Sequence, residues 1–160
     1  MKFECPIVAC IFFRFLIHYC HSLLLRLNIY GNSLVGQLPT ELGELTLLRS
    51  LDLSETKFTG TLPAQLDALN QLTVFAITHT EAKIGGSLPA FATFSKLKEL
   101  NLESNKFEGE MPADFLAGVE NKTAELSVYL GDNLLSGSIP ESLGNFDSLI
   151  LNLEGNQITG

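Results

Sequence analysis

The chain has 160 residues, about the length of one domain and at most two. Its hydrophobic content is 46% and its charged content 18%, which suits a chain that buries a core and argues against a disordered polymer. The formal net charge of −8 argues against nucleic acid as a partner, because binding to phosphates requires a basic face.

Residues 1–22 form an apolar leader that differs from the rest of the chain. They hold all three cysteines, and Arg14 interrupts their apolar run. A signal peptide needs a basic start and a small-residue cleavage site, and a membrane-spanning helix needs about 20 apolar residues. The leader fits both patterns poorly, so three interpretations stay open: a signal or anchor, an improvised N-terminal cap, or a mis-assigned start of the reading frame. Its cysteine and histidine spacing is not that of a zinc site, so we expect no metal and no cofactor.

Residues 23–160 consist of a repeated unit, which we expect in about six copies with the last one incomplete. A proline recurs every 23 to 28 residues, each time three residues after a glycine: Pro39, Pro63, Pro89, Pro112 and Pro140. Two apolar columns precede it: Leu27, Leu51, Phe75, Leu100, Val128 and Leu151, then Ile29, Leu53, Ile77, Leu102, Leu130 and Leu153. Three residues after the second column, four units carry an asparagine: Asn32, Asn105, Asn133 and Asn156.

These columns predict a stack of short parallel elements. Apolar residues two apart are typical of a strand with one buried face, and residues 40–48 and 141–149 have the spacing of a short 3₁₀ or α turn. A unit this short cannot bury its apolar side alone, so neighbouring copies must share a core. We expect the asparagines to satisfy open backbone groups and to form a hydrogen-bonded ladder from unit to unit.

The unit L-x-L-x-x-N-x-L-x-G-x-L-P resembles the plant-specific type of leucine-rich repeat, and it stands almost intact at residues 25–45 and 100–115. The resemblance implies an α/β fold: a right-handed solenoid with a parallel β-sheet on the concave face, short 3₁₀ or α turns on the convex side, and an extra short strand at the G-x-L-P step. Such repeats occur in plant receptor-like kinases, receptor-like proteins and cell-wall enzyme inhibitors, and in algae. The last unit stops without a cap, so we expect a fragment, or another chain over that end.

Three units depart from the pattern. The second has Thr56 in place of asparagine, and a hydroxyl can replace part of the bonding. In the third, residues 78–86 contain two extra residues and no asparagine, which predicts a local bulge around residues 81–83. The fourth is four residues longer, within residues 116–126, and there a glycosylation sequon begins at Asn121. We expect a glycan on Asn121 only if the chain is secreted.

The repeats contain no catalytic motif. They have no cysteine and one histidine, and no G-x-S-x-G, P-loop or H-E-x-x-H sequence. We therefore expect a non-catalytic recognition module that binds a protein or peptide ligand, with polysaccharide as an alternative, on polar residues that point to the concave face. The candidate binding residues are Asp52, Ser54, Glu99, Asn101, Glu103, Tyr129, Asn152 and Glu154. Tyr129 is the preferred anchor, because aromatic residues carry much interface energy.

Two alternatives to a secreted or cell-surface receptor-like protein stay open. The first is an intracellular adaptor or structural solenoid, since repeats without cysteine suit a reducing compartment equally well. The second is an ectodomain fragment of a receptor-like kinase, whose kinase would lie beyond Gly160. In each case we expect membrane contact only through residues 1–22 or through a region after Gly160.

Overall fold

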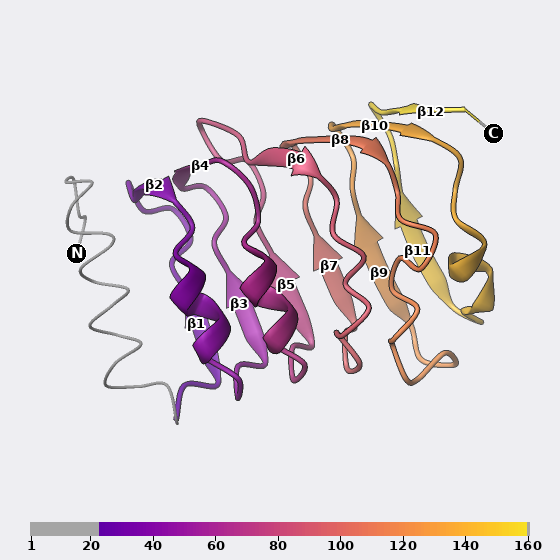
Figure 1. The fold of residues 1–160 in the computed structure, drawn as a ribbon, viewed down its shortest axis with the longest axis horizontal. Helices are drawn as coiled ribbons and strands as arrows, with labels where there is room; N and C mark the ends of the chain where they lie inside the picture. The colour runs from indigo at the N-terminus through magenta and orange to yellow at the C-terminus, as the bar shows by residue number, and fades with distance from the viewer. Residues whose placement is uncertain (1–22, 160) are drawn as a thin grey trace.

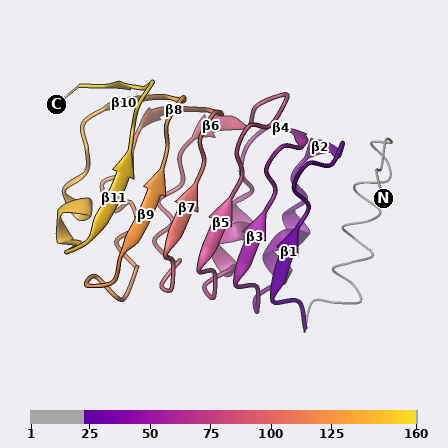
Figure 2. The same cartoon turned by 180° about the vertical axis from the view of Figure 1, so that it is seen from behind.

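The computed structural model describes residues 23–159, so the predictions for residues 1–22 lie outside the described part of the chain. Six parallel strands, one from each unit, form one sheet in the order of the sequence. They are β1 (Arg26–Asn28), β3 (Ser50–Asp52), β5 (Val74–Ala76), β7 (Glu99–Asn101), β9 (Leu126–Tyr129) and β11 (Leu149–Asn152). Figure 2 shows these strands side by side, which confirms the solenoid that the repeated unit predicts.

The register of the strands follows the first apolar column. Leu51 pairs with Leu27 on one side and with Phe75 on the other, and Val128 pairs with Leu100. All five side chains are buried. Because a slip by one residue would turn a strand's core side chain to the other face of the sheet, this buried column fixes the register.

A second set of short strands lies along one edge of the solenoid, at the top in Figure 1. They are β2 (Val35–Gln37), β4 (Lys57–Thr59), β6 (Gly85–Ser87), β8 (Lys106–Glu110), β10 (Leu134–Gly137) and β12 (Gln157–Ile158). They pair as β2–β4 and as β6–β8–β10–β12, and a bridge from Thr61 to Gly85 lies between the two groups. The extra strand expected at the G-x-L-P step is thus confirmed.

The convex side carries the expected 3₁₀ helices. Within residues 23–159 they are η1 (Thr40–Glu44), η2 (Ala64–Ala68) and η3 (Glu141–Asn145). Each follows a proline; the carbonyl of Pro39, for example, accepts a hydrogen bond from the N–H of Leu42 at 3.2 Å. A proline suits this position because its fixed φ ends the preceding strand and leads into the turn.

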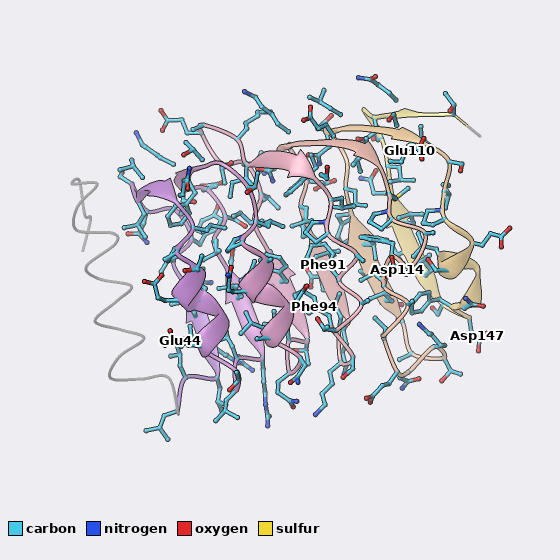
Figure 3. All side chains as sticks on the ribbon, in the orientation of Figure 1. Glu44, Phe91, Phe94, Glu110, Asp114 and Asp147 are labelled. Atoms are coloured by element: carbon cyan, nitrogen blue, oxygen red, sulfur yellow. The ribbon has the colours of Figure 1, made fainter. Side chains whose placement is uncertain are left out.

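Phenylalanines fill the core where the third and fourth units have turns instead of a 3₁₀ helix. The ring of Phe91 lies 6.1 Å from Phe75, 5.1 Å from Phe94 and 6.1 Å from Phe115, measured between centroids. Figure 3 shows Phe91 and Phe94 in the middle of the molecule, with acidic side chains such as Glu44 at its periphery. Aromatic pairs in this geometry contribute about 0.5–1.5 kcal/mol beyond the burial of their area.

The asparagine column forms the predicted ladder. Nδ2 of Asn133 donates at 3.0 Å to the carbonyl oxygens of Leu102, in the preceding unit, and of Leu130, in its own unit. Its Oδ1 accepts from the N–H of Phe107 at 3.0 Å. Asn105 and Asn156 make the same three kinds of hydrogen bond. Asn32 donates from Nδ2 to the carbonyl of Ile29 in its own unit at 2.9 Å.

Threonine occupies the asparagine position in two units. Oγ1 of Thr56 donates to the carbonyl of Leu53 at 2.8 Å, which confirms the expected replacement. The sequence prediction missed the second case, Thr80. Its buried hydroxyl donates to Oδ1 of Asn105 at 2.9 Å and accepts from the N–H of Ile84 at 3.1 Å. The third unit therefore keeps its place in the ladder.

The two extra residues of the third unit form a turn directly after Thr80. The N–H of Lys83 closes this turn by donating to the carbonyl of Thr80 at 3.1 Å. Glu81 in the turn forms an ion pair with Lys57, with 2.8 Å between Oε2 and Nζ. The bulge predicted at residues 81–83 is thus an exposed turn that leaves the core positions of the unit in place.

Candidate ligand-binding face

Three files of residues follow the concave face of the six-stranded sheet. The file before the core column is Arg26, Ser50, Val74, Glu99, Ser127 and Ile150, and the file after it is Asn28, Asp52, Ala76, Asn101, Tyr129 and Asn152. A third file follows at the strand ends: Tyr30, Ser54, Thr78, Glu103, Gly131 and Glu154. Strands about 4.8 Å apart place the six rows across about 24 Å, the reach of about seven residues of extended peptide.

Asx turns stabilise the ends of four of these strands: β1, through Asn28, and three strands that end in predicted site residues. The Oδ1 atoms of Asp52, Asn101 and Asn152 accept hydrogen bonds from the N–H groups two residues further on, at 3.0, 3.2 and 2.9 Å. Asp and Asn are favoured at such positions because their short side chains reach their own backbone. These three predicted site residues therefore support the scaffold, and a ligand can use only their remaining polar atoms.

Ser54 needs a correction, because it is not available on the surface. It is 4% exposed, and its Oγ accepts a hydrogen bond from the N–H of Thr78 in the next unit at 3.1 Å. A buried N–H must be paired, and the serine hydroxyl supplies the acceptor. Ser54 is thus part of the scaffold and does not offer its side chain to a ligand.

Glu103 and Asn152, predicted separately as site residues, are brought together by the fold. Nδ2 of Asn152 donates to Oε1 of Glu103 at 2.9 Å, across the intervening unit. Gly131 in that unit is buried, and a Cβ there would lie 3.1 Å from Oε1 of Glu103 and 3.4 Å from Nδ2 of Asn152. The missing side chain at Gly131 therefore leaves room for the bond.

Three predicted site residues keep their side chains free. The side chains of Glu99, Tyr129 and Glu154 make no hydrogen bond or ion pair with other residues of the range 23–159. Tyr129 is half-buried in the sheet, so its ring is held at the surface. It remains the best-placed aromatic side chain for contact with a ligand near the centre of the C-terminal half.

Two apolar residues of the concave face were missed by the sequence prediction. Val74 on β5 is half-buried and Ile150 on β11 is 43% exposed. Ile150 pairs with Ser127, on the strand that carries Tyr129. The signal in the sequence was their place one residue before the core column, where alternation turns a side chain outward. The prediction looked mainly for polar residues there.

Tyr30 and Glu55 lie together at the N-terminal end of the face. The hydrogen bond between the two side chains is the largest cause of a raised Tyr30 pKa, followed by burial and by the charges of Glu55 and Asp52. Tyr30 itself is 53% exposed. Each cause favours the protonated phenol, because an anion there would face two carboxylates.

The strand ends of the concave face are acidic, whereas the strand starts carry basic residues in the N-terminal units and acidic ones, Glu99 and Glu125, further on. Arg26, Arg49 and Lys98 stand at the starts of the strands, and Arg26 and Arg49 line a hollow with Thr73 and Val74. Acidic residues stand at the strand ends: Asp52, Glu55, Glu103, Asp132 and Glu154. Within residues 23–159 no three His, Cys, Asp or Glu side chains gather into a possible metal site.

Known proteins resemble both the sequence and the fold. Receptor-like protein 18 of Arabidopsis thaliana is 35% identical over 133 residues, which is 82% of this chain and 15% of that protein. The ectodomain of the Arabidopsis thaliana membrane receptor kinase GASSHO1/SCHENGEN3, in complex with CASPARIAN STRIP INTEGRITY FACTOR 2, has a TM-score of 0.72 at 36% identity. The match covers 83% of this chain and 16% of the ectodomain's chain. The chain thus spans a small part of these relatives.

Other solved structures show that this fold serves more than one role. The plant peptide hormone receptor RGFR1, in complex with RGF2, matches with a TM-score of 0.68 and 30% identity over 84% of this chain and 25% of its own. A plant ice-binding protein matches with a TM-score of 0.74 and 30% identity over 84% of this chain and 42% of its own. The ligand must therefore be argued from the residues of this chain.

The family is shown by the repeats themselves. The sequence profile described as Leucine Rich Repeat matches residues 23–45, 47–69, 96–117 and 126–146. The gap from 70 to 95 includes most of the third unit, where Thr80 replaces asparagine and the extra turn is inserted. The chain therefore belongs to the leucine-rich repeat family.

Proposed function

We propose that the chain is part of the recognition region of a cell-surface receptor-like protein and that its concave face binds an extended peptide. Two similar structures support this role: RGFR1 is a peptide hormone receptor in complex with RGF2, and GASSHO1/SCHENGEN3 is a membrane receptor kinase whose ectodomain is in complex with a named factor. A receptor-like protein is also among the curated relatives. These proteins support a recognition role without catalysis by the repeats.

The observation that carries the proposal is a row of residues that the ladder and the Asx turns do not use. Val74, Glu99, Ser127 and Ile150 stand in register on neighbouring strands, and Tyr129 lies two residues beyond Ser127. An extended ligand crossing the strands would meet apolar groups at both ends of this row and a carboxylate between them. Apolar and aromatic anchors of this kind supply most of the energy of an interface.

The edge charges set the kind of peptide that fits. A ligand lying across the strands would have Arg26, Arg49 and Lys98 on one side and the acidic strand ends on the other. We therefore expect acidic or neutral side chains toward the starts of β1 and β3 and basic side chains toward Glu103 and its neighbours. Because these charges are exposed, raising the salt concentration should slow association more than it changes dissociation.

Placement at the cell surface is inferred from the relatives. Within residues 23–159 no helix is long and apolar enough to cross a membrane. Receptor-like protein 18 and the GASSHO1/SCHENGEN3 ectodomain are the relatives that favour a surface location over an intracellular adaptor.

The test is selection of peptides from a displayed random library on the full 160-residue chain, followed by affinity measurements on matched variants. Tyr129→Ala and Ile150→Ser should each weaken binding by about tenfold or more, which corresponds to about 1.4 kcal/mol. Leu134→Ser is the control, since Leu134 on β10 is 45% exposed against 43% for Ile150 but lies off the concave face.

Two results would overturn the proposal. In the first, the selected peptides lose affinity with Leu134→Ser but not with Tyr129→Ala or Ile150→Ser. In the second, the chain enriches no peptide but binds cell-wall oligosaccharides on an array, and the same concave variants weaken that binding. The second result would keep the face and change the class of ligand.

A further inference from the structure

The extra residues of the fourth unit form an ordered extension at the starts of the concave strands. They precede β9 and appear as the orange segment at the lower edge in Figure 1, opposite the short strands. The segment contains Asn121, Lys122 and Thr123, the one N-x-S/T sequence in the 160 residues.

Lys122 anchors this extension to the body of the solenoid. Its Nζ lies 4.1 Å from the centroid of the Phe146 ring and donates to the carbonyls of Leu116 and Ala117 at 3.3 and 3.1 Å. Its own carbonyl accepts from the N–H of Asp147 at 2.9 Å. The residue in the middle of the sequon is therefore fixed to the solenoid, while both neighbours are exposed.

Asn121 presents only one side of its amide to the protein. Its Oδ1 accepts from the N–H and Oγ1 of Thr123 at 3.1 and 2.9 Å, and from the N–H of Ala124 at 3.1 Å. Its Nδ2 makes no hydrogen bond within residues 23–159. The nitrogen that a glycan would occupy is thus free, and a substituent there would displace no contact of the repeats.

We propose that Asn121 is an N-glycosylation site and that its glycan covers the strand-start edge of units four to six while leaving the concave face open. The modification joins Nδ2 of Asn121 to the anomeric carbon of an oligosaccharide. The amide gives up one proton, and the bond from that carbon to the diphosphate of a lipid-linked donor breaks, with its electron pair leaving on the diphosphate. The donor is the oligosaccharide lipid diphosphate of the secretory pathway.

The glycan restricts where a partner can dock. Asn121 lies before β9, at the strand starts, whereas Tyr129, Glu103 and Glu154 lie at or beyond the strand ends. A polar, bulky substituent disfavours a protein interface at its own edge. Partners therefore approach over the concave face or along the edge formed by β2 to β12.

The proposal rests on the cell-surface placement proposed above, so the experiment is expression of the full chain behind an added secretory signal peptide in plant cells. Release of N-glycans with a peptide N-glycosidase and mass spectrometry of the peptide that contains position 121 follow. The expected result is a heterogeneous glycan mass that is lost on release and leaves aspartate at 121. Thr123→Ser should keep the modification and Thr123→Ala should abolish it, although both remove the threonine methyl group. The Ser variant therefore controls for any effect on folding.

An unmodified Asn121 in the wild-type chain, or a glycan that persists in Thr123→Ala, would overturn the proposal. The outcome is separable from the test of peptide binding. The peptide-binding test can use unmodified protein from bacteria. Peptide binding can therefore be absent while Asn121 is glycosylated, and peptide binding can be present while Asn121 is unmodified.

Discussion

Asn152 donates a hydrogen bond to Glu103 at 2.9 Å although 49 residues and one complete unit separate them. Each residue also has a role in its own turn, because Oδ1 of Asn152 accepts from the N–H of Glu154 and the N–H of Glu103 donates to Oδ1 of Asn101. The concave face in the C-terminal half is therefore partly preorganised. Preorganised polar groups bind with a smaller loss of conformational entropy.

Reversing the donor and the acceptor tests this bond. Asn152→Asp keeps the oxygen that caps Glu154 but replaces the donor with a second carboxylate facing Glu103. We expect a loss of about 1 kcal/mol in the free energy of unfolding, measured by urea denaturation, from the lost bond and the repulsion. Adding Glu103→Gln should restore most of it, because the glutamine amide can donate to the aspartate. Simple additivity of the two changes would contradict the bond.

The ladder predicts that substitutions of Asn133 lower the free energy of unfolding by different amounts. Asn133→Ala leaves the buried N–H of Phe107 without its acceptor. It also removes one donor from each of the carbonyls of Leu102 and Leu130, which keep their bonds from Asn105 and Asn156. We expect a loss of about 1–3 kcal/mol in the free energy of unfolding, because an unpaired buried N–H is costly. Asn133→Thr should cost less, since the hydroxyl of Thr56 already makes one such bond in the second unit. Equal losses in both variants would contradict this account.

Neighbouring convex turns approach closely at one glycine and not at another, so replacing each with alanine should affect stability differently. A Cβ on Gly118 would clash with the carbonyl oxygen of Ala92, a backbone atom, whereas a Cβ on Gly144 would meet nothing within 4 Å. Gly118→Ala should therefore lower the midpoint of urea unfolding by the equivalent of about 1–3 kcal/mol. Gly144→Ala should be neutral or raise the midpoint slightly, because alanine restricts the unfolded chain.

Tyr30 should titrate above its ordinary value of 10.0, since the hydrogen bond to Glu55 and the nearby carboxylates hold the proton on the phenol. A folded-state pKa above the unfolded value gives stability that is complete below pH 10 and is lost as the pH rises through the folded pKa. Glu55→Gln should bring the Tyr30 pKa back toward 10.0 in an absorbance titration of phenolate. An unchanged titration curve, with Tyr30→Phe used to assign the residue, would contradict the contact.

Much of the fold could be predicted because each repeated position has one dominant physical role. Leu51 and its column had to be buried, and Pro39 had to follow a strand, so the spacing predicted the six concave strands and the turns. The extra strands at the G-x-L-P step were expected only from the resemblance to plant-type repeats. Thr80 was missed because the prediction looked for asparagine, although its place three residues after Ile77 identifies the ladder position. What the ladder needs is a side-chain hydrogen-bonding group, and threonine supplies one.

The candidate site was less predictable, because surface position does not say which polar groups the scaffold already uses. Asp52, Asn101 and Asn152 look like ligand contacts in the sequence, yet their Oδ1 atoms bond the backbone. Ser54 is buried for a similar reason. The bond across Gly131 depends on the register of three units, which no single repeat encodes.

The central claim is that ligands bind on the six-stranded sheet and not on the short strands. A photoreactive phenylalanine analogue at Ser127 on β9, or at Ser87 on β6, should decide this with a peptide selected on the full chain. The account predicts strong crosslinking to the peptide from position 127 and none above background from position 87. Crosslinking from position 87 alone would place recognition on the short strands and contradict the account.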